Sequence, residues 1–188
     1  TRNYSDDIEY LGVYKVPHFD EKGLVSRYLK KLDTNVNITY LHTSFFYENF
    51  LGTMKLNQDE DGIRRIYLPM NDSLLPMVTV EDIGKMVYKV IIDEIYGDIG
   101  VASEHLKISE IAEIMTETLE EEVQYVNINA DEYRALGFPG CEDLGNMFEF
   151  KDVHNEEFCN MRSMETVRNL IEPTSFKDWC LNNRNNLL

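Results

Sequence analysis

The sequence predicts an α/β protein. Residues 19–32 carry apolar side chains at helical spacing, and residues 36–41 follow as an alternating, β-branched strand. The same alternation of helices and strands continues through the chain, with a short strand at residues 78–80 running into a helix. With 43% hydrophobic residues in 188, the chain can build a core, and no linker is long enough to divide it.

The first helix and strand set the pattern for the rest. We expect a turn at residues 33–35 between them, whereas residues 1–15 have no clear period. The apolar stripe of the helix consists of Leu24, Val25, Tyr28, Leu29 and Leu32.

An aromatic segment, residues 44–51, follows the carboxyl end of that strand. Ligands bind at this edge in open α/β sheets. The core can take some of the rings of Phe45, Phe46, Tyr47 and Phe50, but not easily all four. The segment therefore predicts a binding site at the end of a strand.

The acidic turn at residues 57–62 precedes a strand at residues 64–68. It fits the first half of a calcium loop, but Leu68 stands where the bidentate glutamate is required. We predict an acidic turn without a specific calcium site.

The second half of the chain repeats helix and strand signals. Glu81 and Asp82 favour a helix start, Ser109 can cap another helix, and Ser175 with Asp178 resembles the capping box of a last helix. Strands are expected at residues 98–102 and 123–128. The residues expected to face inward are Ile83, Met86, Val87, Val90 and Ile91 in one helix and Ile111, Ile114, Met115 and Leu119 in the next.

The LGFPG segment at residues 136–140 ends a helix expected over residues 131–136. Gly137 suits a left-handed C-cap and Pro139 prevents the helix from continuing. The segment and its exit, up to Phe150, are too apolar for a solvated connection. It is either a loop packed on a neighbouring layer or the wall of a pocket.

Composition narrows the function classes. A formal charge of −16 argues against direct binding of nucleic acid, and no apolar run reaches the length of a membrane helix. Three dispersed cysteines indicate a reducing compartment, so we expect a cytoplasmic protein. The motifs G-x-S-x-G, H-E-x-x-H, C-x-x-C and G-x-G-x-x-G are all absent.

His18 and Lys22 are four residues apart, so a helix through residues 19–21 would place them on one face. Such a pair at a helix start is ordinarily plain surface. From the residues alone the function stays open.

Four segments in order resemble the NmrA-like family, atypical members of the short-chain dehydrogenase/reductase superfamily. They are VPHFDEKG at residues 16–23, FYEN at residues 46–49, VTVEDIG at residues 78–84 and LGFPG followed by DLGNMF at residues 136–148. The resemblance extends from about Val16 to Leu188 and is strongest to the NADP(H)-sensing members.

The resemblance implies the C-terminal part of a Rossmann-type NAD(P)-binding fold, in about residues 1–55. About residues 56–188 would be mostly the smaller α/β lobe, with some elements returning to the Rossmann sheet. Lys22 would hydrogen-bond the nicotinamide ribose. The residues that would border the nicotinamide and ribose are Phe46, Tyr47, Glu48 and Asn49, and the cleft wall would comprise His18, Tyr133, Phe138 and Pro139.

Departures from the family pattern weaken the expectation of catalysis. His18 stands where the superfamily enzymes have their catalytic tyrosine, although a histidine can also donate a proton. Ser44 and His42 replace a usual proline and arginine. The glycine-rich phosphate turn is absent from the 188 residues, so we expect weak NADP(H) binding or none by this chain alone.

Three functions remain. The first is a regulator that reads the NADP(H) state in the cytoplasm and nucleus and changes protein partners or forms a homodimer. The second is an NADPH-dependent reductase of quinone-like or phenylpropanoid substrates. The third is an interaction module that has lost the cofactor.

Overall fold

The structure, a computed structural model, describes residues 16–32 and 35–188. Of the turn predicted at residues 33–35, residues 33–34 lie outside the described residues, as do residues 1–15. The α-helices are α2 (Pro17–Lys31), α3 (Val80–Ile92), α4 (Ile108–Leu119), α5 (Ala130–Arg134), α6 (Cys141–Val153), α7 (Asn155–Asn160), α8 (Met164–Arg168) and α9 (Phe176–Leu187), and η2 (Tyr47–Leu51) is a 3₁₀ helix. The strands are β1 (Thr39–His42), β2 (Phe45–Phe46), β3 (Arg64–Leu68), β4 (Leu74–Val78), β5 (Gly97–Gly100), β6 (Glu104–Lys107) and β7 (Val123–Asn127).

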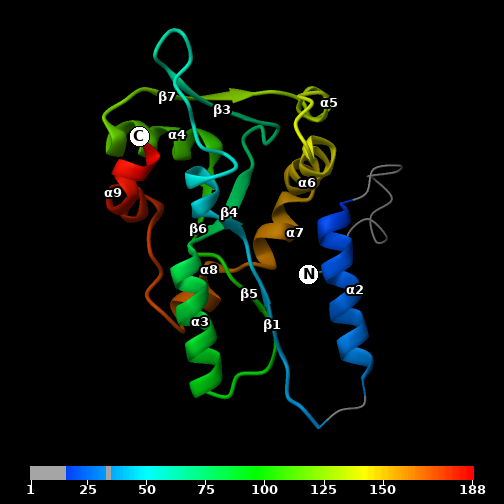
Figure 1. Cartoon of the computed structure of the whole chain (residues 1–188). Helices are drawn as coiled ribbons and strands as arrows, with labels where there is room; N and C mark the ends of the chain where they lie inside the picture. The colour runs from blue at the N-terminus through cyan, green and yellow to red at the C-terminus, as the bar shows by residue number, and fades with distance from the viewer. Residues whose placement is uncertain (1–15, 33–34) are drawn as a thin grey trace.

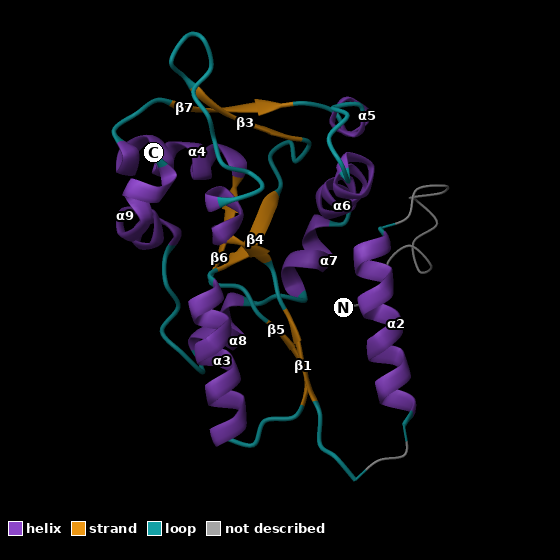
Figure 2. Cartoon of the chain, in the orientation of Figure 1, coloured by secondary structure: helices purple, strands orange, loops and turns teal. Residues whose placement is uncertain are grey.

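The strands form three small sheets stacked along the molecule (Figure 2). β1 pairs with β5 in parallel, with Tyr40 opposite Asp98. β4 pairs in parallel with β2 and antiparallel with β6, and β3 pairs with β7 in parallel. The described chain is therefore an α/β structure with mainly parallel pairing, as the sequence predicts.

Two separate cores hold these sheets. The larger one packs the aromatic segment against α4, α6 and α9, with Phe50, Phe148, Phe176 and Trp179 among its buried rings. The smaller one lies under α3 and β5 and consists of Val78, Met86, Val90, Ile99, Val101 and Val167. Figure 1 shows these two regions as the upper and lower parts of the molecule.

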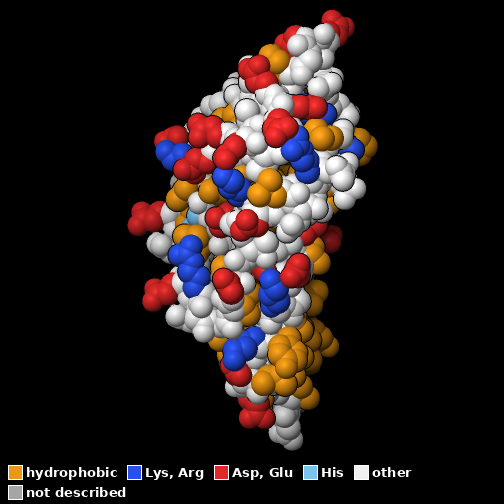
Figure 3. All heavy atoms as spheres, turned by 90° about the vertical axis from the view of Figure 1, so that its left-hand side faces the viewer, with side chains coloured by type: hydrophobic (Ala, Val, Ile, Leu, Met, Phe, Trp, Pro, Cys, Tyr) orange, Lys and Arg blue, Asp and Glu red, His pale blue; other side chains and the backbone are white. Residues whose placement is uncertain are grey.

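The long helices α2 and α3 expose much of their apolar surface, which corrects the expected inward stripe of α3. Met86 and Val90 are buried, but Val87 is 40% and Ile91 67% exposed, because the side of α3 that carries them packs on no described element. In Figure 3 a hydrophobic patch lies at the lower right of the view, in the part of the molecule that contains α3. The α2 stripe is likewise exposed at Leu24, Val25, Tyr28 and Leu32.

Several boundaries differ from the sequence predictions. Ser109 lies inside α4 and does not cap it, because the helix starts at Ile108 and the Glu110 carboxylate accepts from Lys107 N at 2.7 Å. The last helix is capped as predicted, with Ser175 Oγ accepting from Asp178 N at 3.0 Å. β3 has the predicted bounds, and its Arg65 pairs with both Asp59 and Asp61 of the acidic turn. No helix in the described part of the chain is long and apolar enough to cross a membrane.

The segment after LGFPG is a helix, α6, and not a loop up to Phe150 as expected. Gly137 adopts the predicted left-handed conformation, with φ of 76°, although α5 already ends at Arg134. Gly145 and Asn146 are weak helix formers, so the pattern hid the helix. Gly145 is nevertheless required, since a Cβ there would lie 2.6 Å from the Arg134 side chain where α5 crosses α6.

Candidate functional site

A cavity of about 460 Å³ lies between α2, the aromatic segment and the helices α5 to α7. Its volume is within the roughly 300–1,000 Å³ of small-molecule sites. It brings together seven of the nine residues expected around the cofactor, which come from three distant parts of the chain. These are His18, Lys22, Phe46, Asn49, Tyr133, Phe138 and Pro139.

The mouth of the cavity, defined by the partly exposed His18, Lys22, Phe46 and Phe138, contains two groups able to donate protons or hydrogen bonds. His18 Nδ1 pairs with Asp143 Oδ2 of α6, which ties α2 to the opposite wall. Lys22 is exposed, and within residues 16–32 and 35–188 no acceptor lies at hydrogen-bonding distance from its amino group. The amino group of Lys22 is therefore available for a ligand.

The segment of residues 46–49 divides between cavity and core. Phe46 and Asn49 line the cavity. The Tyr47 ring is fully buried, packs on Phe176 and Trp179, and donates its hydroxyl to Thr174 O at 3.3 Å. Burial raises the pKa of this hydroxyl well above its usual value.

Glu48 faces the start of α3 instead of the cavity. Its carboxylate accepts from Thr79 Oγ1 at 2.6 Å and from Val80 N at 3.1 Å. Tyr47 and Glu48 thus fix the segment in place, and direct contact of either with a cofactor stays a prediction.

The wall opposite the aromatic segment comes from the LGFPG segment and α6. The Phe138 ring stands edge-on to Tyr133 at 5.7 Å, and Tyr133 in turn contacts Phe148 at 5.6 Å. Burial raises the pKa of Tyr133 to about 12, so this phenol stays protonated at neutral pH. The LGFPG segment is both packed and a lining of the cavity.

The inner end of the cavity, defined by Phe45, Phe148, Lys151, Phe158 and Arg162, is buried throughout. Lys151 is only 3% exposed, and its Nζ lies 5.4–5.6 Å from the centres of the three rings. No carboxylate or carbonyl in the described part of the chain accepts a hydrogen bond from this ammonium group. Burial, with the nearby Arg162 charge, lowers the pKa of Lys151 to about 7.

Arg162 completes the inner end. Its guanidinium stacks 3.9 Å from the centre of the Phe158 ring, and its Nε donates to Thr43 O at 3.1 Å. Sequence reasoning missed both cations. A signal for Lys151 exists, because it lies three and four residues after the core residues Phe148 and Met147, on the buried face of α6.

The charge of the lining is opposite to that of the chain. The chain carries −16, yet the lining of the cavity contains Lys22, Lys151, Arg162 and His18 and no aspartate or glutamate. Among the described residues no group of three or more His, Cys, Asp or Glu side chains could hold a metal ion. The cavity therefore suits an anionic ligand with apolar parts.

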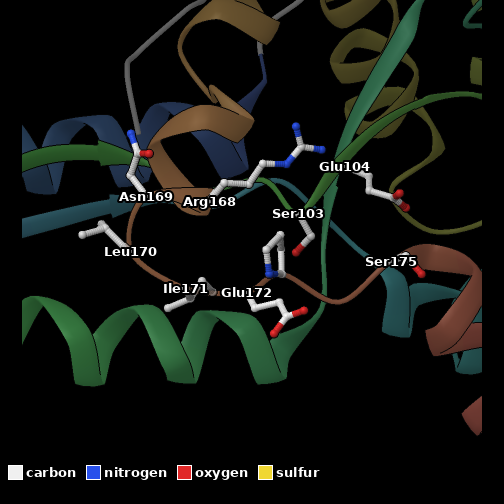
Figure 4. A pocket seen from close by; sticks show the side chains of 9 residues that line it. Ser103, Glu104, Arg168, Asn169, Leu170, Ile171, Glu172 and Ser175 are labelled. Carbon is white, nitrogen blue, oxygen red and sulfur yellow. The ribbon is translucent and has the colours of Figure 1, made fainter.

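A second hollow, of about 590 Å³, lies between the start of β6, the end of α8 and the segment that joins α8 to α9. Figure 4 shows the Arg168 side chain extending over the side of this hollow that carries Ser103 and Glu104. Two acidic residues, Glu104 and Glu172, line it. The Glu104 carboxylate already has a partner in the fold, because Oε2 accepts from Phe176 N at 2.6 Å. None of the nine residues expected around the cofactor lines this hollow.

Comparison with known proteins agrees with this geometry. The model of the NmrA-like family matches residues 4–179. The negative transcriptional regulator NmrA in complex with NAD is similar in structure, with a TM-score of 0.74 and 17% identity over 96% of this chain and 61% of that one. Its complex with NADP gives a TM-score of 0.73 and 18% identity over 92% and 60%.

The triphenylmethane reductase of Citrobacter sp. complexed with NADP(H) is also similar, with a TM-score of 0.65 and 14% identity over 100% of this chain and 63% of that one. The chain spans about three fifths of the length of these structures. At such identities the likeness establishes the fold, and it confirms the predicted Rossmann-type α/β class.

Proposed function

The chain belongs to the NmrA-like family, and we propose that it acts as a regulatory protein that senses NADP(H) and is not an efficient dehydrogenase. The observation that carries this proposal is the mouth of the cavity. Lys22 and Asn49 offer polar groups beside the ring of Phe46, and no carboxylate in the lining repels a dinucleotide. Structural relatives in complex with NAD or NADP support the same ligand class.

The residues of the mouth fit the nicotinamide end of such a cofactor. Lys22 would donate to a ribose hydroxyl, and Phe46 and Asn49 would border the nicotinamide. Tyr47 and Glu48 would act indirectly, by anchoring the segment on Thr174 and on the start of α3. The bound cofactor would supply a hydride, or report by its oxidation state the redox balance of the cell.

The phosphate end of the cofactor lacks an evident site in this chain. A glycine-rich turn before a helix supplies backbone N–H donors to the pyrophosphate, and the 188 residues contain no such motif. We therefore propose that this chain alone binds NADP(H) weakly. Contacts on the nicotinamide side would provide what affinity remains.

His18 is the reason to propose a sensor before an enzyme. In the superfamily enzymes that the sequence resembles, the corresponding position is the catalytic tyrosine. A sensor would instead respond by changing a protein partner or its own oligomeric state, in the cytoplasm and nucleus. These partners and locations are part of the proposal.

A calorimetric titration with NADPH and with reduced nicotinamide mononucleotide tests the ligand. If only the nicotinamide side is held, the two affinities should agree within about threefold, because the adenosine and its phosphates add few contacts. Lys22→Met should weaken both about tenfold through the loss of a hydrogen bond to a charged donor.

The matched control is Lys31→Met, in the last turn of the same helix, which should bind like the parent chain. Micromolar or tighter NADPH binding, far above that of the mononucleotide, would overturn the proposed weak binding. Equal binding by Lys22→Met and the parent chain would overturn the site.

A second candidate function, NADPH-dependent reduction of a quinone-like or phenylpropanoid compound, is favoured by the pairing of His18 with Asp143. A carboxylate on Nδ1 orients an imidazole and leaves Nε2 to exchange a proton with a ligand. Steady NADPH oxidation with such compounds, abolished in both Lys22→Ala and His18→Gln, would select this function over the sensor.

A further inference from the structure

We propose that the inner end of the cavity binds the carboxylate of a small aromatic acid, with Lys151 as the residue that pairs with it. The inference extends the proposed function, because it assigns a second ligand to the same cavity beyond the nicotinamide side. It rests on where Lys151 lies, on what surrounds it, and on the charge of the lining.

The first argument is the burial of a cation without an anion. Lys151 is 3% exposed and faces Phe45, Phe148 and Phe158, and no described residue offers its Nζ a hydrogen-bond acceptor. Ring faces attract a cation, but they replace only part of its lost hydration. A carboxylate in the cavity would supply the negative charge that the described residues do not place beside Lys151.

The second argument is the shape and chemistry of the space in front of Lys151. Aromatic rings dominate the lining, with Met54, Leu144 and Met147 between them. Aromatic rings prefer edge-to-face or offset contact with other rings. The rings that line the cavity are those of Phe19, Phe45, Phe46, Tyr133, Phe138, Phe148 and Phe158. The body of the ligand is therefore apolar and aromatic.

The third argument is that the lining of the cavity contains basic side chains and no aspartate or glutamate. Arg162 lies beside Lys151, and Lys22 and His18 stand at the mouth. The acidic residues of this −16 chain lie outside the lining. The carboxylate of a bound aromatic acid would pair with Lys151, and its ring would pack on the aromatic side chains of the lining. A neutral analogue would make only the ring contacts.

Binding of a carboxylate must also take up protons near neutral pH. The pKa of Lys151 is lowered to about 7, and an anion beside the amine favours its protonated form. The affinity for the acid should therefore fall as the pH rises above 7, by at most about tenfold per pH unit. The affinity for a neutral analogue should not change.

The experiment is a ¹⁹F NMR titration with 4-fluorobenzoate, with 4-fluorobenzamide as its neutral twin and cyclohexanecarboxylate as a non-aromatic competitor. At pH 6.5 the benzoate should bind at least about tenfold tighter than the amide, the size expected for a hydrogen bond to a charged group. It should also bind more tightly than the cyclohexane acid.

Two variants locate the binding. Lys151→Met, which keeps an unbranched apolar side chain, should reduce benzoate affinity to that of the amide. Lys177→Met is the matched control, because Lys177 is exposed and pairs with Glu117 on the far side of the core. It should bind benzoate like the parent chain. Equal binding of benzoate and amide by the parent chain, or unchanged benzoate binding by Lys151→Met, would overturn the proposal.

The test separates this inference from the proposed function. Lys22→Met should weaken binding of the reduced mononucleotide about tenfold and keep most of the benzoate binding. Lys151→Met should lower the benzoate affinity to that of the amide and keep the mononucleotide binding. If only the mononucleotide result fails, the sensor proposal is wrong while the acid site stands. If a variant fails to fold, the ratio of the benzoate affinity to the amide affinity in the parent chain still tests the acid site, together with the pH dependence of that ratio.

Discussion

Two buried charges, one in each core region of the molecule, are held in opposite ways. In the lower region the Asp82 carboxylate is fully buried and accepts four hydrogen bonds, from Ser103 Oγ at 2.6 Å, Thr174 N at 2.7 Å, Lys85 Nζ at 2.9 Å and Thr174 Oγ1 at 3.0 Å. In the upper region the Lys151 side chain is also buried, at 3% exposed, but its ammonium group faces rings and a cavity.

The Asp82 carboxylate stabilises the fold through its hydrogen bonds. We propose that the Lys151 ammonium group binds a ligand. Burial alone would raise the pKa of Asp82, but its hydrogen bonds outweigh burial and the pKa lies below the usual value. The pKa of Lys151 is instead lowered, because nothing in the described chain compensates its burial. The folded state stabilises the charged form of Asp82 and penalises the charged form of Lys151.

The largest effect on stability is expected at Asp82. Asp82→Ala leaves the donors of Ser103, Thr174 and Lys85 without their acceptor and disconnects α3 from the segment before α9. We expect the free energy of unfolding to fall by about 3–5 kcal/mol, the range for breaking a buried charged network. Urea denaturation followed by circular dichroism measures it.

Glu81→Ala is the matched control, since Glu81 lies in the same helical turn but its side chain is 73% exposed. It should change stability by no more than about 0.5 kcal/mol. Because the pKa of Asp82 is lowered, its stabilisation is present above the usual aspartate pKa and is lost as the pH falls through the lowered value. Similar losses in the two variants would remove the contrast between Asp82 and an ordinary surface acid.

Lys151→Met should change the free energy of unfolding in the direction opposite to Asp82→Ala. Replacing an uncompensated buried cation by an apolar side chain of similar shape should raise the free energy of unfolding at pH 7 by about 1–4 kcal/mol. Lys177→Met should leave it within about 0.5 kcal/mol. A gain in stability together with a loss of acid binding is the trade-off expected of a functional residue. A loss of stability in Lys151→Met would mean that the ammonium holds the fold.

The pH dependence of that gain follows from the lowered pKa. Between about 7 in the folded state and the usual value of about 10.4 in the unfolded state, the unfolded chain binds the extra proton. The stability of the parent chain therefore rises with pH across this window. The advantage of Lys151→Met should be largest at or below pH 7 and shrink by about 1.4 kcal/mol per pH unit above it.

The mouth of the cavity could be predicted from the sequence, and its inner end could not. His18 and Lys22 stand four residues apart, and Phe46 and Asn49 follow a strand, so local spacing and the resemblance pointed to them. Residues 46–49 show the limit of this reasoning, because a contiguous motif divides between the cavity and the core. Only the fold shows that Tyr47 turns toward Trp179 and Glu48 toward α3.

Lys151 and Arg162 were not predicted as cavity residues, because their surroundings depend on contacts between residues distant in the sequence. Phe45 meets Lys151 across more than a hundred residues, and Arg162 reaches back to Thr43. The exposure of the apolar sides of α2 and α3 could not be predicted for the same reason. Helical spacing identifies an apolar face but not the layer that covers it.

The most direct test of the cavity as an acid-binding site is the pKa of Lys151 itself, measured by NMR on protein with ¹³C-labelled lysines. Lys151→Met assigns the resonance. We predict a pKa of about 7 in the free protein and a clear increase when 4-fluorobenzoate is saturating, with 4-fluorobenzamide leaving it unchanged. A pKa near the usual 10.4 that neither compound moves would contradict the account.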